Sequence, residues 1–245
     1  MIDYSLYLCT NSEMNNNYPL EYCVEQAIIG GVTIVQIREK EKQYDEFLKI
    51  ANKIKKITDK YNVPLIINDN IEIMLEINAD GIHIGQNDIS CLKARKILGN
   101  KKIIGVTVTN ITEAKEAIES GASYLGVGAI FKSTTKKDAK VVGIKELKKI
   151  VDYSPIPVVV IGGINKNTIH LLKNIKIDGY AMIRPILQQE NIVENVKLLK
   201  KIINNNMKEL YTIAQKQQKF FYWLMKYFNK YGIILWEIIK KIYGQ

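Results

Sequence analysis

Three polar side chains at every second position of one segment are the first candidates for chemistry. Segment 34–40 reads IVQIREK, so Gln36, Arg38 and Lys40 alternate with other residues. Alternate side chains of a β-strand share a face, which would bring an amide, a guanidinium and an ammonium together. Arg binds oxyanions through a fork of donors and Lys acts as a point charge, so the pattern predicts a phosphate or diphosphate site. A solvated edge strand would explain the same pattern without a ligand.

The residues before this segment favour the ligand interpretation. The run IGGV at 29–32 is typical of a helix end that turns into a buried strand. A strand that is buried on both faces and still presents Gln, Arg and Lys needs a polar partner. We therefore expect segment 34–40 to contribute to an anion-binding site.

Polar or glycine residues also follow the later segments that we predict to be strands. They are Asn68-Asp69, Gln86 with Asp88, Thr107, Ser133-Thr134-Thr135-Lys136, Gly162-Gly163 and Arg184. In a parallel barrel the carboxyl ends of the strands surround one site, where all of these residues would meet. Together they predict anion and metal chemistry at one end of a barrel.

Asp69 and Asp88 are the acidic residues after the third and fourth predicted strands. Two carboxylates with open space between them suit Mg²⁺, which uses one or two carboxylates, waters and substrate phosphate oxygens. Each could instead cap the helix that follows it. Beside Gln36, Arg38 and Lys40, the metal interpretation is favoured.

The remaining candidates are weaker when they are taken singly. Gly162-Gly163 follows a predicted strand and precedes a predicted helix, so its N–H groups could hold a phosphate, although turns use such pairs too. His83 alternates with isoleucines in a predicted strand and fits a core position as well as a site, whereas His170 falls in a predicted helix. No Ser-His-Asp or Cys-His arrangement stands out, which disfavours nucleophilic catalysis.

Strand-like and helix-like segments alternate along most of the chain. We predict strands at 4–9, 34–38, 64–67, 81–84, 103–108, 124–130, 157–161 and 179–183. We predict helices at 20–29, 44–61, 71–77, 90–98, 112–119, 144–151, 165–175 and 192–203, with Ser90 and Thr112 as caps. Eight such units predict an α/β protein with a (β/α)8 TIM barrel, and a doubly wound open sheet is the alternative.

Composition is that of an ordinary globular protein, with 47% hydrophobic and 24% charged residues. No run approaches the roughly 18 apolar residues of a membrane span, and the N-terminus lacks the pattern of a signal peptide. Cys9, Cys23 and Cys91 lack metal-type spacing, so we expect reduced thiols in a cytoplasmic protein. The net charge of +10, half of it on the first 206 residues, fits a phosphorylated substrate as well as a nucleic acid, but no nucleic-acid motif is present.

Several short segments occur in a specific order. They read VQIREK at 35–40, ND at 68–69, ADGIHIGQND at 79–88, GVT at 105–107, GVGAIF and STTK between 126 and 136, and IGGI at 161–164. In combination they resemble the thiamine phosphate synthase family over residues 4–203. The resemblance implies a barrel transferase of thiamine biosynthesis that joins 4-amino-2-methyl-5-hydroxymethylpyrimidine diphosphate to thiazole phosphate, or its carboxylated form, with Mg²⁺ as cofactor.

The resemblance also implies a role for each matching residue. The pyrimidine diphosphate would contact Gln36, Ile37, Arg38, Glu39, Lys40, Asn68, Thr107 and Lys136, of which Arg38, Lys40 and Lys136 would be catalytic. The thiazole phosphate would contact Ser133, Thr134, Thr135, Gly162, Gly163, Ile183 and Arg184, and Asp69 and Asp88 would hold the metal. Arg184 stands where the family usually has a small Ser, and could clamp the thiazole phosphate or crowd it.

Two other functions fit parts of the pattern. A thiazole tautomerase-like relative would use a His as acid and base and would lack diphosphate-binding groups. Here both aspartates and the cations at 38 and 40 are present, and Thr107 has no His near it in the sequence. A non-catalytic protein that binds thiamine precursors is the other alternative, and the presence of Asp69, Asp88 and Lys136 argues against it.

Residues 207–245 form the second expected unit, after a catalytic domain at 1–206. This segment carries seven Lys and two Glu, with apolar residues at helical spacing between them. We predict one or two helices that pack on the barrel or on a partner subunit of a homo-oligomer. A basic amphipathic helix at a membrane surface or against a partner protein is the alternative, but the lysines are not sorted to one face.

Overall fold

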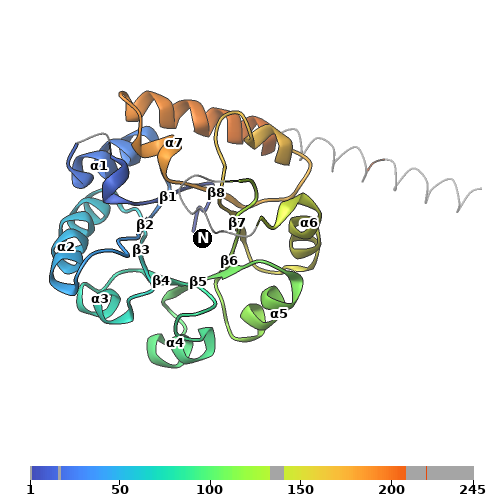
Figure 1. Ribbon diagram of the computed structural model, residues 1–245, viewed down its shortest axis with the longest axis horizontal. Helices are drawn as coiled ribbons and strands as arrows, with labels where there is room; N and C mark the ends of the chain where they lie inside the picture. The colour runs from blue at the N-terminus through green and yellow to red at the C-terminus, as the bar shows by residue number, and fades with distance from the viewer. Residues whose placement is uncertain (1, 16–17, 133–140, 208–218, 220–245) are drawn as a thin grey trace, which may run out of the picture.

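Eight parallel strands form a closed barrel in the computed structural model, which describes residues 2–15, 18–132, 141–207 and 219 (Figure 1). Each strand pairs with the next one along the chain, and β8 pairs with β1. The strands are β1 (Leu6–Cys9), β2 (Ile34–Ile37), β3 (Leu65–Asn68), β4 (Gly81–Ile84), β5 (Ile103–Val108), β6 (Tyr124–Val127), β7 (Val158–Val160) and β8 (Gly179–Met182). The TIM barrel is confirmed, and the open sheet is excluded.

Helices surround the barrel (Figure 1). They are α1 (Leu20–Gly30), α2 (Tyr44–Tyr61), α3 (Ile71–Glu76), α4 (Cys91–Leu98), α5 (Ile111–Glu119), α6 (Gly143–Tyr153), α7 (Arg184–Leu187) and a helix over residues 192–207, with short 3-10 helices η1 (Ser12–Met14) and η2 (Ile169–Leu172). The side chain of Ser90 caps α4, as predicted. The strands β2 and β6 end earlier than predicted, at Ile37 and Val127.

Two helix predictions are wrong in detail. The helix expected at 165–175 is reduced to η2, because Thr168 Oγ1 donates to Gly163 O at 2.9 Å and accepts from Asn165 N–H at 2.9 Å. Such side-chain bonds to the backbone compete with helix formation. Asn110 rather than Thr112 caps α5, since its side chain accepts from the N–H of Glu113 at 3.0 Å. The unpredicted α7 begins directly after β8 with a proline in its first turn, which suits a helix start.

Strand side chains alternate between two apolar layers. One layer fills the barrel interior and includes Tyr7, Ile34, Ile66, Ile103, Tyr124 and Val159. The other lies between the barrel and the helices and includes Leu8, Val35 and Ile67. The period of two along each strand therefore decides which side chains can reach the interior of the barrel.

The helix over residues 192–207 lies between α1 and α6 and completes the ring of helices (orange in Figure 1). Gly30 permits its close approach to α1, because a Cβ there would lie 2.7 Å from the Cβ of Val196. Lys200 Nζ donates to Gly31 O at 3.1 Å, and Asn206 Nδ2 donates to Ile169 O at 2.9 Å. Most of the extension predicted at 207–245 lies outside the described residues.

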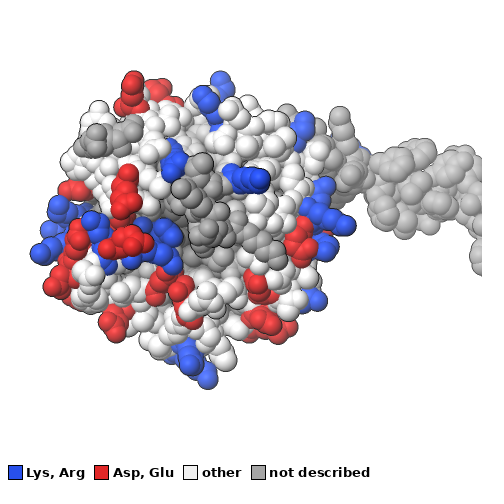
Figure 2. Space-filling view, viewed as in Figure 1, with Lys and Arg blue, Asp and Glu red and all other residues white. Residues whose placement is uncertain are grey.

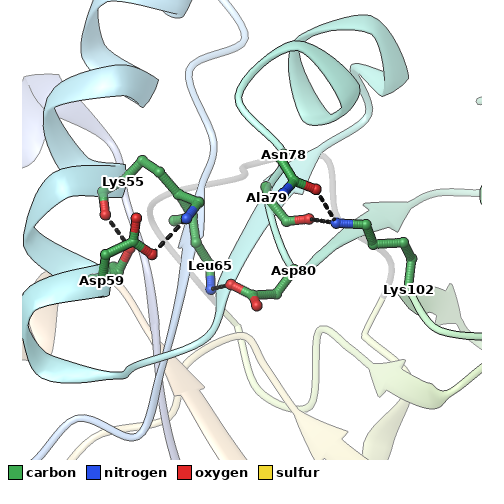
Figure 3. Close-up of polar contacts among 8 residues, drawn as sticks. Lys55, Asp59, Leu65, Asn78, Ala79, Asp80 and Lys102 are labelled. Atoms are coloured by element: carbon green, nitrogen blue, oxygen red, sulfur yellow. Dashed lines mark hydrogen bonds and ion pairs between the residues drawn. The ribbon is translucent and has the colours of Figure 1, made fainter.

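The residue before each even-numbered strand holds the first or second residue of the preceding strand through two hydrogen bonds. Asp80 donates its N–H to Leu65 O at 2.9 Å. Its Oδ2 accepts the N–H of Leu65 at 2.8 Å (Figure 3). The same reciprocal pairing joins Thr33 to Leu6, Ser123 to Ile104 and Asp178 to Val158. We call these four pairs the strand-start brackets. They satisfy backbone groups that would otherwise lose a partner on folding.

Further hydrogen bonds reinforce this end of the barrel. Lys102 Nζ donates to Asn78 Oδ1 at 2.6 Å and to Ala79 O at 2.7 Å (Figure 3). The Arg95 guanidinium donates to the backbone oxygens of Gly121, Gly99 and Lys102. Charged side chains at the strand starts thus serve structure, which leaves the opposite end for a site.

Charged side chains of both signs are mixed on the face of the molecule shown in Figure 2. Lys and Arg lie next to Asp and Glu, particularly at the left of that view. Among the described residues, no helix is both long enough and apolar enough to cross a bilayer.

Candidate active site

A cavity of about 690 Å³ lies at the carboxyl ends of the strands, and all eight strands contribute to its wall. Its lining includes Cys9, Gln36, Asn68, His83, Thr107, Gly126, Val159 and Ala181, one residue from each strand. The loops that follow the strands supply charged residues to the same cavity. A concave site of this size, mostly apolar with convergent polar groups, is typical of small-molecule binding.

Most of the predicted site residues that the structure describes meet in this cavity. They are Gln36, Arg38, Lys40, Asn68, Asp69, Asp88, Thr107, Gly162, Gly163, Ile183 and Arg184. The remaining predicted residues, Ser133, Thr134, Thr135 and Lys136, lie outside the described residues. Residues distant in the sequence therefore converge as the barrel geometry requires.

Ile37 and Glu39 do not line the cavity. Ile37 is fully buried in the apolar layer between the barrel and the helices. Glu39 is also buried, and its carboxylate accepts hydrogen bonds from Thr10 Oγ1 at 2.8 Å and Ser12 Oγ at 2.6 Å. Glu39 thus joins the loop after β1 to the loop after β2 that carries Arg38 and Lys40.

A lysine and two carboxylates form the most polar part of the cavity. Lys40 Nζ lies 2.7 Å from Asp69 Oδ2, and the Asp69 and Asp88 carboxyl groups are within hydrogen-bonding reach of each other. Burial raises the pKa of Asp69, and the neighbouring Asp88 raises it further, while Lys40 opposes both effects. The hydrogen bonds from Asp69 and from the Gly85 N–H outweigh burial at Asp88 and lower its pKa.

Neither carboxylate is a helix cap. The side chain of Asn70 caps α3 by accepting from the N–H of Ile73 at 2.9 Å, and Ser90 caps α4. Asp88 Oδ2 instead accepts the N–H of Gly85 at 2.6 Å. Asp69 has a left-handed backbone with φ of 61°, a conformation that Asp tolerates better than most residues. The capping alternative is therefore wrong, and both side chains remain available to the cavity.

Gly162 and Gly163 bring the loop after β7 against the loop after β6. Both have positive φ, and a Cβ on Gly162 would lie 2.5 Å from the Cβ of Ala129. A Cβ on Gly163 would lie 2.6 Å from the Cβ of Phe131. These positions therefore require glycine for close approach, and they place backbone against the cavity where an anion could bind.

Comparison with known proteins identifies the family. The family model described as thiamine monophosphate synthase matches residues 6–186. This chain belongs to that family. It is 49% identical over 199 residues to the thiamine-phosphate synthase of Clostridium botulinum, which covers 81% of this chain and 93% of that protein. A second relative, the thiamine-phosphate synthase of Clostridium beijerinckii, is 48% identical over 199 residues and covers 81% of this chain and 95% of its own length.

A solved structure agrees with the assignment to the thiamine monophosphate synthase family. Thiamine phosphate pyrophosphorylase from Pyrococcus furiosus superposes with a TM-score of 0.77 at 32% identity, and the match covers 84% of this chain and 98% of that one. The family resemblance read from the sequence motifs is confirmed, and so is the barrel architecture expected from the spacing of strands and helices.

The donor set of this thiamine monophosphate synthase family member is compatible with a divalent cation. Asp69 and Asp88 put two carboxylates side by side with one lysine to offset them. Within the part of the chain that the structure describes, no cluster of three or more His, Cys, Asp or Glu side chains could hold a metal. A cation here would thus take its remaining ligands from water and from substrate oxygens, as Mg²⁺ commonly does.

A chain of hydrogen bonds crosses the barrel interior and lines the floor of the cavity. Gln36 Nε2 donates to Tyr7 Oη at 2.8 Å, and Tyr7 Oη lies 2.8 Å from Tyr124 Oη. Tyr124 Oη lies 2.8 Å from His83 Nδ1, and His83 Nε2 lies 2.8 Å from Thr107 Oγ1. Burial lowers the pKa of His83 to about 4, so this imidazole is neutral near pH 7. Sequence reasoning missed both tyrosines, although each lies at an inward position of its predicted strand.

The three cysteines are free and buried. Cys9 lines the cavity, and burial raises the pKa of its thiol to about 12. A thiol with so high a pKa is a poor nucleophile at neutral pH.

Proposed function

We propose that this chain is a thiamine-phosphate synthase. It would join the pyrimidine methylene carbon of 4-amino-2-methyl-5-hydroxymethylpyrimidine diphosphate to the nitrogen of thiazole phosphate, or of its carboxylated form. The bond from that carbon to the diphosphate oxygen breaks, and diphosphate leaves with the bonding electrons. With the carboxylated form, the carboxyl group also leaves as CO2, and its bonding electrons stay on the thiazole ring. The observation that carries the proposal is that Arg38 and Lys40 share one cavity with the paired carboxylates of Asp69 and Asp88.

The arrangement supports a leaving-group mechanism. Arg38 and Lys40 would bind the diphosphate and stabilise the charge that develops on it, together with Lys136, which lies outside the described residues. Gln36, Asn68 and Thr107 would orient the pyrimidine ring. This chemistry needs fixed positive charge and exclusion of water more than it needs a general base. The cavity offers fixed positive charge through Arg38 and Lys40.

Asp69 and Asp88 would hold Mg²⁺, which neutralises the charge of a leaving diphosphate when it is bound. The adjacency of the two carboxyl groups and the raised pKa of Asp69 support this role, since a cation beside them would offset their repulsion. Lys40 remains within reach of both Asp69 and the cavity.

The opposite side of the cavity would bind the thiazole phosphate. Gly162, Gly163, Ile183 and Arg184 lie there, at the loop after β7 and the start of α7. We place Ser133, Thr134 and Thr135 in the same subsite on the strength of the family resemblance. The small phosphorylated substrates would be the partners of the chain, and its free buried thiols support a cytoplasmic location.

The tautomerase-like alternative needs a histidine that can exchange protons with a ligand. His83 lies beside Thr107 in space, but both of its ring nitrogens already have hydrogen-bond partners in the interior. Its low pKa further disfavours uptake of a proton near pH 7. The synthase proposal therefore fits the geometry better.

The test is a product assay on the full chain. The chain is incubated with the pyrimidine diphosphate, thiazole phosphate and Mg²⁺, and thiamine phosphate and diphosphate are quantified. We expect equal amounts of the two products, with turnover that requires both substrates and stops in excess chelator. Absence of thiamine phosphate, with carboxylated or plain thiazole phosphate, would refute the proposal.

A further inference from the structure

Five side chains at the floor of the cavity are joined by one continuous chain of hydrogen bonds, and all five line the cavity. Gln36 is at one end and Thr107 at the other, and Tyr7, Tyr124 and His83 connect them at four successive distances of 2.8 Å. Tyr7, Tyr124 and Gln36 are almost completely buried. A buried hydroxyl or imidazole that lacks a partner is costly, so each member depends on its neighbours.

The direction of donation follows from the chemistry of the groups. An amide nitrogen can only donate, so Tyr7 accepts from Gln36 and must give its own single proton to Tyr124. Tyr124 then gives its proton to His83 Nδ1, which leaves the imidazole proton on Nε2 to be donated to Thr107 Oγ1. If donation ran in the opposite direction, Tyr7 Oη would accept hydrogen bonds from both Gln36 and Tyr124, and its own hydroxyl proton would have no acceptor among these five side chains.

We propose that Tyr7, Tyr124 and His83 are positioning residues whose directional hydrogen bonds present Gln36 to the cavity as an acceptor and Thr107 as a donor. With one Nε2–H donated to Tyr7, Gln36 keeps its Oε1 as an acceptor and its second Nε2–H as a donor for a ligand. With Oγ1 accepting from His83, Thr107 has its hydroxyl proton left for a ligand. The hydrogen-bond chain thereby fixes which amide atom of Gln36 faces Tyr7, which frees Oε1 to accept, and it leaves the Thr107 hydroxyl proton to be donated.

Two strand glycines provide the space for this hydrogen-bond chain. Their presence is independent evidence that the barrel accommodates the rings of the chain. A Cβ on Gly105 would lie 2.3 Å from Tyr124 Oη, and a Cβ on Gly126 would lie 2.8 Å from His83 Cε1. Glycine in a strand interior is unfavourable unless something must approach closely. Here the approaching groups are the ring of Tyr124 and the ring of His83.

The consequence for substrates rests on the proposed function. An aminopyrimidine offers amino donors next to ring-nitrogen acceptors, and a diphosphate offers acceptors. An acceptor at Gln36 and a donor at Thr107 would match that pattern, whereas the reversed chain would present the opposite pattern. The hydrogen-bond chain would thus affect the affinity for the pyrimidine substrate and leave the affinity for thiazole phosphate unchanged.

The first test is the tautomer of His83, read by long-range ¹H–¹⁵N NMR of the imidazoles in the full chain. The sequence has two histidines, and exposed His170 serves as the internal reference. We expect a single Nε2–H tautomer for His83 at neutral pH, and loss of this single state in Tyr124→Phe. An Nδ1–H tautomer of His83, or an exchanging mixture of the two tautomers, in the unsubstituted protein would overturn the proposal. This readout needs no enzymatic activity, so it is separate from the test of the proposed function.

The second test compares Tyr124→Phe with Tyr4→Phe in steady-state kinetics. Tyr4 packs against Tyr124 with ring centroids 5.0 Å apart but is not a member of the chain, so it controls for effects on packing. We expect Tyr124→Phe to raise KM for the pyrimidine diphosphate roughly fivefold to tenfold and to leave KM for thiazole phosphate within twofold. Equal changes in both variants, or in both KM values, would assign Tyr124 a structural role alone and overturn the proposal.

Discussion

Lys40 Nζ lies 2.7 Å from Asp69 Oδ2. The ammonium group that we propose to bind diphosphate therefore also contacts a carboxylate that we propose to bind Mg²⁺. The ammonium opposes the rise in the pKa of Asp69 that burial and Asp88 cause. Lys40 therefore connects the two halves of the proposed leaving-group site. Its exposed fraction is 45%, so this ion pair contributes little to folding and is better explained by function.

Lys40→Ala and Arg38→Ala should each weaken use of the pyrimidine diphosphate. Loss of a charged hydrogen bond to the diphosphate should lower kcat/KM for this substrate by roughly 10–100-fold. Lys42→Ala is the matched control, because Lys42 lies on the same loop and pairs with Glu46 instead. Steady-state kinetics with each substrate varied in turn would measure the effect. Damage confined to the KM for thiazole phosphate would mean that the two subsites are interchanged.

Asp69→Asn and Asp88→Asn should weaken use of Mg²⁺ without unfolding the barrel. Asn keeps an oxygen acceptor and tolerates the left-handed backbone at position 69, but it lacks the charge that favours a divalent cation. Turnover should fall, and more Mg²⁺ should be needed for half-maximal activity. Asp59→Asn on α2 is the control, and circular dichroism would verify the fold. Normal turnover of both variants at limiting Mg²⁺ would exclude them as ligands.

The low pKa of His83 should lower the free energy of unfolding as the pH falls below about 6.5. Its pKa is about 4 when folded and about 6.5 when unfolded, so the unfolded chain gains a proton first as the pH falls. The contribution is fully present above pH 6.5 and is lost progressively down to about pH 4, where the loss reaches about 3 kcal/mol. Urea unfolding at several pH values should show a shallower slope for His83→Asn.

The strand-start brackets should matter for stability and leave chemistry intact. Asp80→Ala and Asp178→Ala each remove the acceptor of a backbone N–H at the start of a strand. We expect a loss of roughly 1–3 kcal/mol in the free energy of unfolding, with kcat unchanged. Asp59→Ala, which breaks a surface pair with Lys55, should cost no more than about 0.5 kcal/mol. Similar losses for all three variants would show that the strand-start brackets stabilise the fold no more than an exposed ion pair does.

The period of two in the strands was enough to predict much of the site. Gln36, Arg38 and Lys40 alternate in the sequence and line one cavity, while Ile37 and Glu39 between them do not. The barrel also made the convergence of Asp69, Asp88 and Thr107 predictable, because strand ends in a closed parallel sheet must meet. Local pattern and global geometry act together at these positions.

Contacts between distant strands could not be predicted in the same way. Tyr7 and Tyr124 meet in the barrel interior, and nothing in either strand specifies the other. Gly105 and Gly126 were signals, since an interior glycine indicates a close approach, but the approaching group is not encoded locally. The helix expected at 165–175 failed for a related reason, because Thr168 bonds to the Gly163 carbonyl rather than supporting a helix.

The strand-start brackets also determine the stagger of the barrel. Sliding one strand of a bracketed pair by a single residue would break both bonds between, for example, Asp80 and Leu65. The same slip would turn every inward side chain of that strand out toward the helices, including Asn68 or His83. Stagger and strand tilt are linked in a closed sheet. The alignment of the substrate-facing side chains is therefore set at the end of the barrel that faces away from the cavity.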